Sequence, residues 1–353
     1  MLAEEVKRRN IPPLLRNAVS PDSWEDERER LVGLFAENVY GISPPAPELI
    51  SSLIQKEDTI AFAGKATHRR VMLSFDTPKG MASFGVDTVR PNQKGKLPMF
   101  IFLSFHPYLG SYETPIEEIL DSGYALAILH YEAVTADNED MDSGLAGMFD
   151  RGGRDAWGKI GVWAYALSRV MDYVHTLDDI DQERVACVGH SRLGKTVLWC
   201  CAQDTRFRAV FSNDSGCSGA AITRKKRGET VRDIYTKFPY WFCENYRKYM
   251  DVEDQMPFDQ HCLLASIAPR LCYVCSAEDD EWADPQSEYL SCMLAGEAWE
   301  RLGKKGLVGA DRYPKPGDTF HAGSIGYHIR EGKHFLSRYD WRRFIAFMNK
   351  HTS

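Results

Sequence analysis

The sequence predicts an α/β protein in which helices flank a doubly wound, mostly parallel sheet. Two short apolar runs bounded by turn residues, 97–105 and 124–130, are typical of strands that helices cover on both faces. From Trp157 to Val174, apolar residues recur at steps of three and four, which predicts an amphipathic helix. Strands and helices that alternate in this way build a mostly parallel sheet.

The chain begins with a charged, helix-prone stretch that ends at a cluster of prolines. We expect residues 1–55 to form an N-terminal helical appendage and residues 56–353 to form one α/β domain. Alternating apolar residues at 71–75, a turn at 78–80 and a second run at 82–89 predict a hairpin at the start of that domain.

The elements continue to alternate after the amphipathic helix. A buried strand is predicted at 185–188, a helix at 193–202, and further strands at 207–211 and 271–275. A final helix is predicted at 340–350. The chain shows no internal repeat, so we expect one elaborated domain rather than an array.

Charge and hydropathy exclude several classes of partner. The chain of 353 residues has a formal net charge of −7, and its basic side chains are scattered apart from residues 224–227, so no nucleic-acid partner is expected. The run at 97–105 is about half of the ~18 residues that a membrane-spanning helix needs, so no membrane insertion is expected. Residues 1–19 mix charges with prolines and do not resemble a signal peptide. We therefore expect a cytoplasmic protein or a secreted one without its leader.

The nine cysteines all fall between Cys187 and Cys292 at irregular spacing. An odd number at such spacing indicates buried thiols rather than a disulfide framework. Cys272 and Cys275 form a CxxC motif, but within a strand their side chains point to opposite faces. We therefore expect no zinc or redox site there.

The segment from Val185 to Lys195 predicts a buried strand, a turn of small residues and a helix. A serine at such a corner, here Ser191, is lifted out of the sheet, and the N-terminus of the next helix offers N–H groups that stabilise an oxyanion. Gly189 leaves room for the tight turn, although the second glycine falls one position later than in the G-x-S-x-G pattern. The motif alone also fits a helix N-cap serine.

A nucleophilic serine needs a histidine base and an acid that orients it. In doubly wound hydrolases the acid and then the histidine follow the nucleophile along the chain, each after a later strand. Asp280 follows the strand at 271–275, and His334 lies in a loop before the final helix. His328 is a competing candidate in a strand-like stretch, and His334 by itself also fits a surface histidine.

Five ordered motifs between residues 60 and 350 together resemble the bacterial branch of the glucuronoyl esterases. They are Gly189 to Lys195, Ser212 to Gly216, Arg227 to Thr230, Asp280 to Pro285, and Gly326 to His334. Members of this family are α/β-hydrolases that cleave the ester between 4-O-methyl-glucuronic acid on xylan and an alcohol of lignin. The resemblance implies an α/β-hydrolase catalytic domain over residues 56–353, with glucuronoxylan or its uronate-bearing oligosaccharides as substrate. It also implies chemistry that needs no cofactor and no metal.

The resemblance makes Ser191 the nucleophile and His334 the base, while Arg192 supports the oxyanion with its backbone N–H and its guanidinium. Three further positions match residues with which the family contacts the sugar: Lys195, Glu229 and Trp282. For Lys195 and Glu229, the structural alternative is a surface ion pair. For Trp282, the alternative is a place in the core. Because the tryptophan lies in an acidic run, we expect it at the rim of a site.

Members of the family keep their catalytic acid after either of two strands. Asp214 occupies the earlier position, where many members carry a glutamate, and Asp280 occupies the later one. Because aspartate is one methylene shorter, we expect Asp280 to be the acid and rank Asp214 second. Fungal members bond a cysteine before the serine to one beside the histidine. These positions are His190 and Phe335 here, so that disulfide is absent.

The predicted function is hydrolysis of (4-O-methyl-)glucuronoyl esters on glucuronoxylan through a glucuronoyl-enzyme intermediate. The nearest alternative is an acetylxylan or other carbohydrate esterase with the same triad, which would have no use for a cation directed at the uronate hydroxyls. An alternative of another class is a non-catalytic saccharide-binding protein, against which the retention of Ser191, His334 and two carboxylates argues. The preferred alcohol, the oligomeric state and the compartment stay open.

Overall fold

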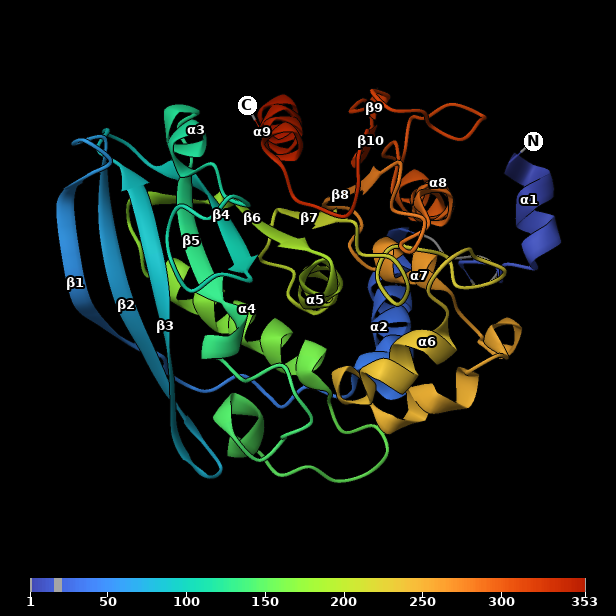
Figure 1. The fold of residues 1–353 in the computed structure, drawn as a ribbon, viewed down its shortest axis with the longest axis horizontal. Helices are drawn as coiled ribbons and strands as arrows, with labels where there is room; N and C mark the ends of the chain where they lie inside the picture. Colours follow the sequence, from blue (N-terminus) through green and yellow to red (C-terminus); the bar gives the residue numbers. More distant parts are fainter. Residues whose placement is uncertain (1, 16–20, 353) are drawn as a thin grey trace.

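The computed structural model describes residues 2–15 and 21–352, and their centre is a ten-stranded sheet (Figure 1). Its strand order is β1-β2-β3-β5-β4-β6-β7-β8-β10-β9. The strands are β1 (Ser51–Ala61), β2 (Ala66–Thr77), β3 (Gly80–Pro91), β4 (Leu97–Ser104), β5 (Ala125–His130), β6 (Ile180–His190), β7 (Ala209–Asn213), β8 (Leu271–Ala277), β9 (Thr319–Phe320) and β10 (Ile325–Arg330). The adjacent strands β5, β4, β6, β7, β8 and β10 pair in parallel. The remaining pairs, β1–β2, β2–β3, β3–β5 and β10–β9, are antiparallel. The predicted doubly wound sheet is confirmed.

Helices cover both faces of the sheet. They are α1 (Leu2–Arg9), α2 (Trp24–Phe35), α3 (Ile116–Asp121), α4 (Lys159–Val174), α5 (Arg192–Gln203), α6 (Val231–Lys237), α7 (Gln260–Ala265), α8 (Pro285–Arg301) and α9 (Arg338–Thr352). The helices α3 and α9 lie on one face, whereas α4, α5, α7 and α8 lie on the other (Figure 1). Along β4, Ile101 packs toward the second group and its neighbours Phe100 and Phe102 pack toward the first. Within the described ranges, no helix is both long and apolar enough to cross a bilayer.

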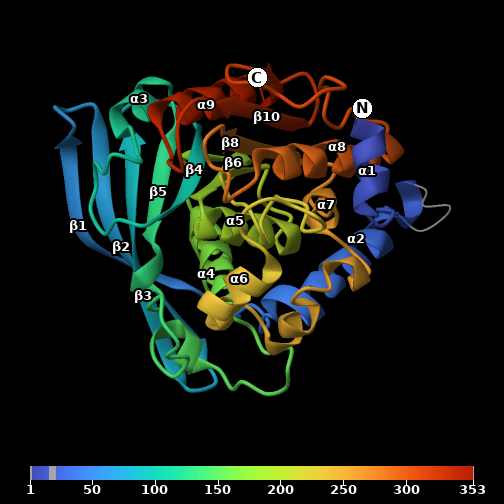
Figure 2. The ribbon, with the colours of Figure 1, turned by 45° about the vertical axis from the view of Figure 1, so that its right-hand side comes forward.

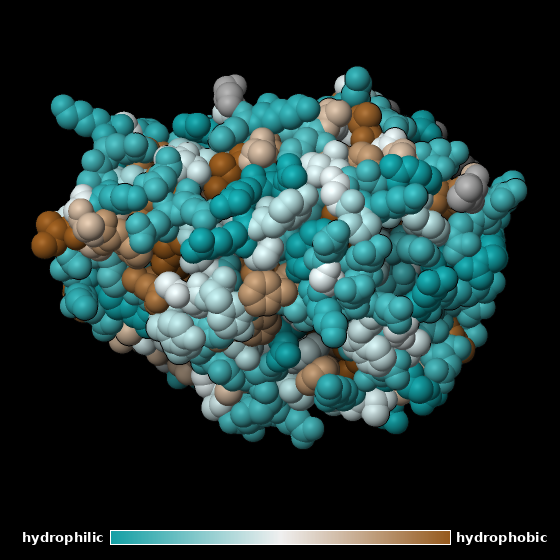
Figure 3. All heavy atoms as spheres, turned by 45° about the horizontal axis from the view of Figure 1, so that its top comes forward, coloured by the Kyte–Doolittle hydropathy of each residue, from teal (hydrophilic) through white to brown (hydrophobic). Residues whose placement is uncertain are grey.

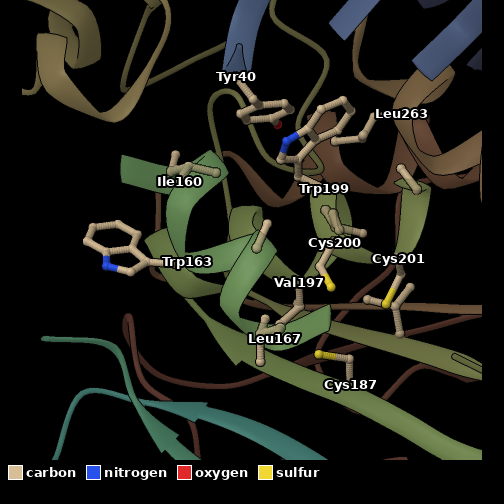
Figure 4. Packing of buried hydrophobic residues seen from close by; sticks show 14 of the residues in the cluster. Tyr40, Ile160, Trp163, Leu167, Cys187, Val197, Trp199, Cys200, Cys201 and Leu263 are labelled. Carbon is tan, nitrogen blue, oxygen red and sulfur yellow. The ribbon is translucent and has the colours of Figure 1, made fainter. Parts of the chain in front are cut away.

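The predicted helix is α4, and it is buried on nearly every face rather than along one apolar stripe, within the larger core cluster. Figure 4 shows Ile160 and Trp163 of α4 beside α5, to which Val197 belongs. The nine cysteines are free and buried. Cys272 and Cys275 pack into clusters on opposite faces of the sheet, which confirms the expectation from strand geometry.

The N-terminal segment carries one strand that the sequence pattern did not indicate. Both α1 and α2 fall within residues 1–55, and the indole N–H of Trp24 donates to the carbonyl of Ala268 (3.1 Å), which anchors α2 beside α7 (Figure 2). Ser51 already begins β1, an edge strand whose side chains are mostly exposed on both faces. Such a strand has no alternating apolar pattern. Residues 16–20 of the predicted appendage lie outside the described residues, and the domain boundary stays a prediction.

The parallel strands bring the predicted site residues to one edge of the sheet. Ser191 follows β6 directly, and Asp214 follows β7 directly. Asp280 lies in the loop after β8, and His334 lies in the loop between β10 and α9. Carboxyl ends of parallel strands meet at the same edge, which is where α/β proteins bind their ligands.

A methyl group at Gly189 should destabilise the fold, because its Cβ would lie 2.3 Å from the carbonyl oxygen of Leu193. We expect Gly189→Ala to lower the free energy of unfolding by about 1–3 kcal/mol, as overpacking does. The control is Gly33→Ala in α2, where a Cβ meets nothing within 4 Å and alanine favours the helix by about 1 kcal/mol. Denaturant melts of both variants measure the difference. Equal stability of the two would show that the corner yields without strain.

Candidate active site

Ser191 stands alone between a strand and a helix, in a strained backbone conformation. Its φ and ψ angles are 57° and −126°, a region that costs a non-glycine residue on the order of 1–3 kcal/mol. Two backbone hydrogen bonds hold it there: the Ser191 N–H donates to the carbonyl of Asn213 (2.9 Å), and the Lys195 N–H donates to the carbonyl of Ser191 (3.2 Å). The predicted strand, turn and helix are thus present, and the serine projects at the start of α5.

His334 is hydrogen-bonded to Asp280. Its Nδ1 atom lies 2.6 Å from Oδ2 of the carboxylate, whose other oxygen accepts from the backbone N–H of Ala283 (3.2 Å). Burial alone would raise the pKa of Asp280, but the hydrogen bond and the charge of His334 outweigh burial and hold that pKa below its ordinary value. The aspartate is buried while the imidazole is partly exposed, so the hydrogen bond orients an accessible imidazole.

Asp214 contacts the loop that carries His334. One of its carboxylate oxygens lies within 4.8 Å of a ring nitrogen of His334, yet its hydrogen bonds run elsewhere. It accepts from the backbone N–H groups of Ala277 (2.8 Å) and Phe335 (3.4 Å) and pairs with Arg330 (3.3 Å). Burial raises the pKa of Asp214 well above its ordinary value. In this geometry Asp280 contacts the histidine and Asp214 contacts the loop that carries it.

Arg330, the last residue of β10, clamps the loop that carries His334. Its guanidinium donates to three carbonyls of the loop 331–335, those of residues 331, 333 and 335. The remaining donors contact Asp340 (3.1 Å) and Asp214. Each of the five N–H groups of the guanidinium therefore has an acceptor. The sequence motif around residue 330 thus places an arginine directly before the loop whose carbonyls it binds.

The Arg192 guanidinium is enclosed by an acid and aromatic rings. It pairs with Asp137, and its central carbon lies 4.8 Å from the ring centre of Trp241 and 5.7 Å from that of Phe238. The indole N–H of Trp241 also donates to Asp137 (2.7 Å). Sequence reasoning missed this aspartate and both rings, since they lie far from the serine along the chain and in no motif. The guanidinium is held in place, while the backbone N–H of Arg192 lies at the first turn of α5.

The eight predicted site residues line one cavity of about 340 Å³. They are Ser191, Arg192, Lys195, Asp214, Glu229, Asp280, Trp282 and His334. Lys195 is buried and donates to the carbonyl of Ser215, and no ion pair joins it to Glu229 in the described chain. Burial lowers the pKa of Lys195, and the carboxylate of Glu229 opposes this shift. Trp282 is 57% exposed, so it lies at the rim and not in the core.

Glu288 of α8 does not line the cavity but binds Gly216, which does, and it was not singled out by sequence reasoning. Its carboxyl oxygens accept from the backbone N–H of Gly216 (2.9 Å) and from the hydroxyl of Ser276 (2.5 Å). Burial raises the pKa of Glu288 to about 7. A lone glutamate inside a helix carries no local signal of such a role, because its partners come from loops and strands distant in sequence.

Two groups of side chains bring possible metal ligands together in the described chain. One is Asp214, Asp280 and His334, and the other is Cys275, His328 and Asp340. His328 lies in β10 and is hydrogen-bonded to Asp340 (2.8 Å) in the core. Arg330 pairs with an aspartate of each group. The positive charge of Arg330 lies beside both groups of side chains and repels a metal cation. Both groups therefore suit hydrogen bonding better than metal binding.

Comparisons with known proteins agree with this geometry. The chain matches the family model for "Glucuronyl esterase, fungi" over residues 75–303. It is 34% identical to Carbohydrate esterase MZ0003 from an unknown prokaryotic organism, across 95% of this chain and 86% of that protein. The solved glucuronoyl esterase from Solibacter usitatus has a TM-score of 0.90 and 34% identity, covering 97% of this chain and 98% of that one. The 4-O-methyl-glucuronoyl methylesterase of Podospora anserina is 26% identical over 80% of this chain and is covered over 57% of its own length.

The fold and these similarities define a carboxylic-ester hydrolase of the α/β-hydrolase class. The chain belongs to the glucuronoyl esterase family, and its similarity to bacterial esterases confirms the predicted bacterial branch.

Replacing Glu288 should change how stability depends on pH. The folded protein keeps this carboxyl protonated to about pH 7, whereas an unperturbed glutamate releases its proton near 4.5. Between these values the unfolded chain binds fewer protons, so the contribution of Glu288 to the free energy of unfolding falls as pH rises. We expect Glu288→Gln to gain about 1–3 kcal/mol relative to wild type between pH 5 and pH 8.

Denaturant melts at the two pH values measure that gain. Glu300→Gln, at an exposed position of the same helix, is the control. A stability difference between Glu288→Gln and wild type that is the same at both pH values would contradict the raised pKa.

Proposed function

We propose that the protein hydrolyses esters of (4-O-methyl-)glucuronic acid on glucuronoxylan, with Ser191 as the nucleophile. The observation that carries this proposal is one cavity that holds Ser191 and the hydrogen-bonded pair of His334 and Asp280 together with Lys195 and Glu229. The first three side chains suit acyl transfer, and the last two suit recognition of sugar hydroxyls.

In the first step His334 takes the proton of Ser191 as the hydroxyl oxygen attacks the ester carbonyl carbon. The backbone N–H of Arg192 and the N-terminus of α5 stabilise the oxyanion, a contribution of about 3 kcal/mol per donor in comparable enzymes. Asp280 keeps the imidazole in the tautomer whose Nε2 accepts the proton. His334 then protonates the alcohol oxygen as its bond to carbon breaks, which leaves the glucuronoyl group on Ser191.

In the second step water replaces the alcohol. His334 takes a proton from the water molecule as the water oxygen attacks the acyl carbon, and it returns that proton to Ser191 when the acyl bond breaks. The products are the free uronic acid and the restored serine. This chemistry uses only groups that line the cavity.

The side chains beside Ser191 favour a uronate over an acetyl group. Lys195 begins one helical turn after the serine, so both extend from the same side of α5. Its ammonium gives one hydrogen bond to the carbonyl of Ser215, and an ammonium has three donors. Glu229 can accept from sugar hydroxyls, and Trp282 offers an exposed ring at the rim. A pyranose held by these groups presents its own carboxyl carbon to Ser191.

The relatives support the same substrate class. The Podospora anserina relative is named a 4-O-methyl-glucuronoyl methylesterase, and the Solibacter usitatus structure is named a glucuronoyl esterase. A uronate ester also offers sugar hydroxyls to Lys195 and Glu229, whereas an acetyl group by itself offers them none.

The proposal predicts a strong preference for uronate esters. Wild type should cleave methyl glucuronate with a kcat/KM about 100-fold or more above that for acetylated xylan, because a site that hydrogen-bonds its substrate penalises analogues without those groups. Ser191→Ala should abolish turnover while its melt stays cooperative. Purified enzyme and titration of the released acid measure both substrates. A native preference for acetyl groups would assign the protein to the acetylxylan esterases instead.

The two aspartates should differ in their effect on rate. Asp280→Asn should lower kcat by about 10⁴-fold, since loss of the orienting carboxylate leaves the histidine in the wrong tautomer. Asp214→Asn should cost less, because Asp214 contacts the loop backbone and Arg330 rather than the imidazole. Steady-state rates on methyl glucuronate separate the two. A larger loss of kcat for Asp214→Asn would instead identify Asp214, at the earlier position, as the catalytic acid.

A further inference from the structure

A chain of hydrogen-bonded polar side chains runs through the core beneath the loop that carries His334. The hydroxyl of Tyr273 in β8 lies 2.7 Å from Nε2 of His321 and 2.9 Å from Nδ1 of His328 in β10. Nε2 of His328 in turn lies 2.8 Å from Oδ1 of Asp340 in α9. The side chains of Tyr273, His328 and Asp340 are fully buried. None of the three lines the active-site cavity, so a ligand bound there does not touch them.

Each group in this chain has a defined hydrogen-bonding role. Burial alone would raise the pKa of Asp340, but the hydrogen bond from His328 and the charge of Arg330 outweigh burial and hold that pKa below its ordinary value. The carboxylate only accepts, so Nε2 of His328 carries the proton between them. Burial lowers the pKa of His328. The ring is therefore neutral, and its Nδ1 accepts the hydroxyl proton of Tyr273.

Asp340 binds both ends of the loop between β10 and α9. Arg330, the last residue of β10, donates through Nε to Oδ2 of the carboxylate (3.1 Å). Ser337, the last residue before α9, donates to the same oxygen from its backbone N–H and from its hydroxyl (2.7 Å each). Arg330 also donates to the carbonyl of Lys333, the residue before His334 (3.1 Å). A rotation of the Asp340 carboxylate would therefore loosen the loop at both ends.

The hydrogen bond from His328 opposes that rotation. It reaches Oδ1 of Asp340, whereas Ser337 binds Oδ2. A carboxylate that is bound at both oxygens cannot turn about its Cβ–Cγ bond without losing a hydrogen bond. His328 is in turn held by the hydroxyl of Tyr273, so the chain of side chains fixes the base of the loop from within the sheet.

The network lies where water cannot replace a lost partner. The face that carries α3 and α9 comes forward in Figure 3 and is largely hydrophilic, and the three buried side chains lie beneath it. Taking a carboxylate out of water costs several kcal/mol, and apolar side chains in place of a buried ionic group are often as stable. A buried network in which every member is satisfied instead selects one arrangement. These properties favour a role in geometry over a role in stability.

We propose that His328 is a positioning residue, which fixes Asp340 and thereby the loop that carries His334. The inference rests on the proposed function, because the position of the loop matters through ester cleavage. His334 must meet both Asp280 and Ser191, and a displacement of about 1 Å can lower a rate by about 100-fold. Because the network does not line the cavity, its loss should lower kcat and leave KM.

The test compares His328→Leu with His328→Gln on methyl glucuronate. Leucine removes the donor to Asp340, so kcat should fall by about 10- to 100-fold with little change in KM. Glutamine keeps a donor for Asp340 and an acceptor for Tyr273, so it should restore much of the rate. Denaturant melts give the folded fraction of each variant, and kcat is calculated for folded protein alone. Tyr273→Phe removes one hydroxyl from the same chain, should also lower kcat, and carries the test if leucine prevents folding.

Tyr124→Phe is the matched control. Tyr124 is also buried, and its hydroxyl lies 2.7 Å from the side chain of Asn349, near the other end of α9 from Asp340. This variant loses a comparable hydrogen bond and should keep the kcat of wild type. A double variant gives a second check. Added to Asp280→Asn, His328→Leu should cost little more, because residues that act through the same group are not additive.

An unchanged kcat in folded His328→Leu and Tyr273→Phe would overturn the proposal. An equal loss in Tyr124→Phe would also overturn it, as would the full loss repeated in the Asp280→Asn background, because either result indicates a general structural effect. Cleavage of acetyl esters alone by wild type would refute the proposed substrate and not the positioning role, which the same variants then test on those esters. Failure of wild type on both kinds of ester would refute the proposed function, and the inference with it.

Discussion

The parallel pairing of neighbouring strands is the constraint on which the site depends. In the register of the sheet, His190 at the end of β6 lies opposite Asn213 at the end of β7, and Ala277 of β8 lies opposite Arg330 of β10. The loops that follow these residues therefore start side by side, although they are separated by many residues along the chain. Such loops bring Ser191, Asp280 and His334 to the same edge of the sheet, and Arg330 then fixes the loop that carries His334.

Burying several carboxylates close together costs free energy unless each charge is compensated, and this site uses three kinds of compensation. Asp280 is paired with His334 through a hydrogen bond of 2.6 Å. Asp214 shares the guanidinium of Arg330, which also closes the histidine loop. Glu288 has no cation within ion-pair distance in the described chain, and its raised pKa of about 7 keeps it protonated in mildly acidic solution. One buried arginine thus both balances the charge of Asp214 and holds the loop that carries His334.

Ring contacts pack against the loop that carries His334 from two sides. They involve His190 and Phe335. The ring of His190 lies 4.5 Å from that of His334, and burial lowers the pKa of His190 to about 3, so His190 presents a neutral ring to His334. Phe335 stacks instead on Tyr112 of another loop. Ring packing thus contacts the loop from both sides, and the stack of Phe335 on Tyr112 stays partly exposed to solvent.

The sequence by itself determined the elements whose pattern is local: the apolar runs of the parallel strands, the stripe of α4, and the corner at Ser191, where strand, small residue and helix follow one another directly. It also predicted that Ser191, Asp280 and His334 lie together at one edge of the sheet, which the structure shows. Only the tertiary structure decided which acid touches His334, that Arg330 clamps its loop, and that Glu288 binds Gly216 of the cavity lining. It also revealed β1, whose exposed faces carry no pattern. The physical reason is that periodicity records which faces of an element are buried, whereas a hydrogen bond between distant loops depends on how the sheet brings their ends together.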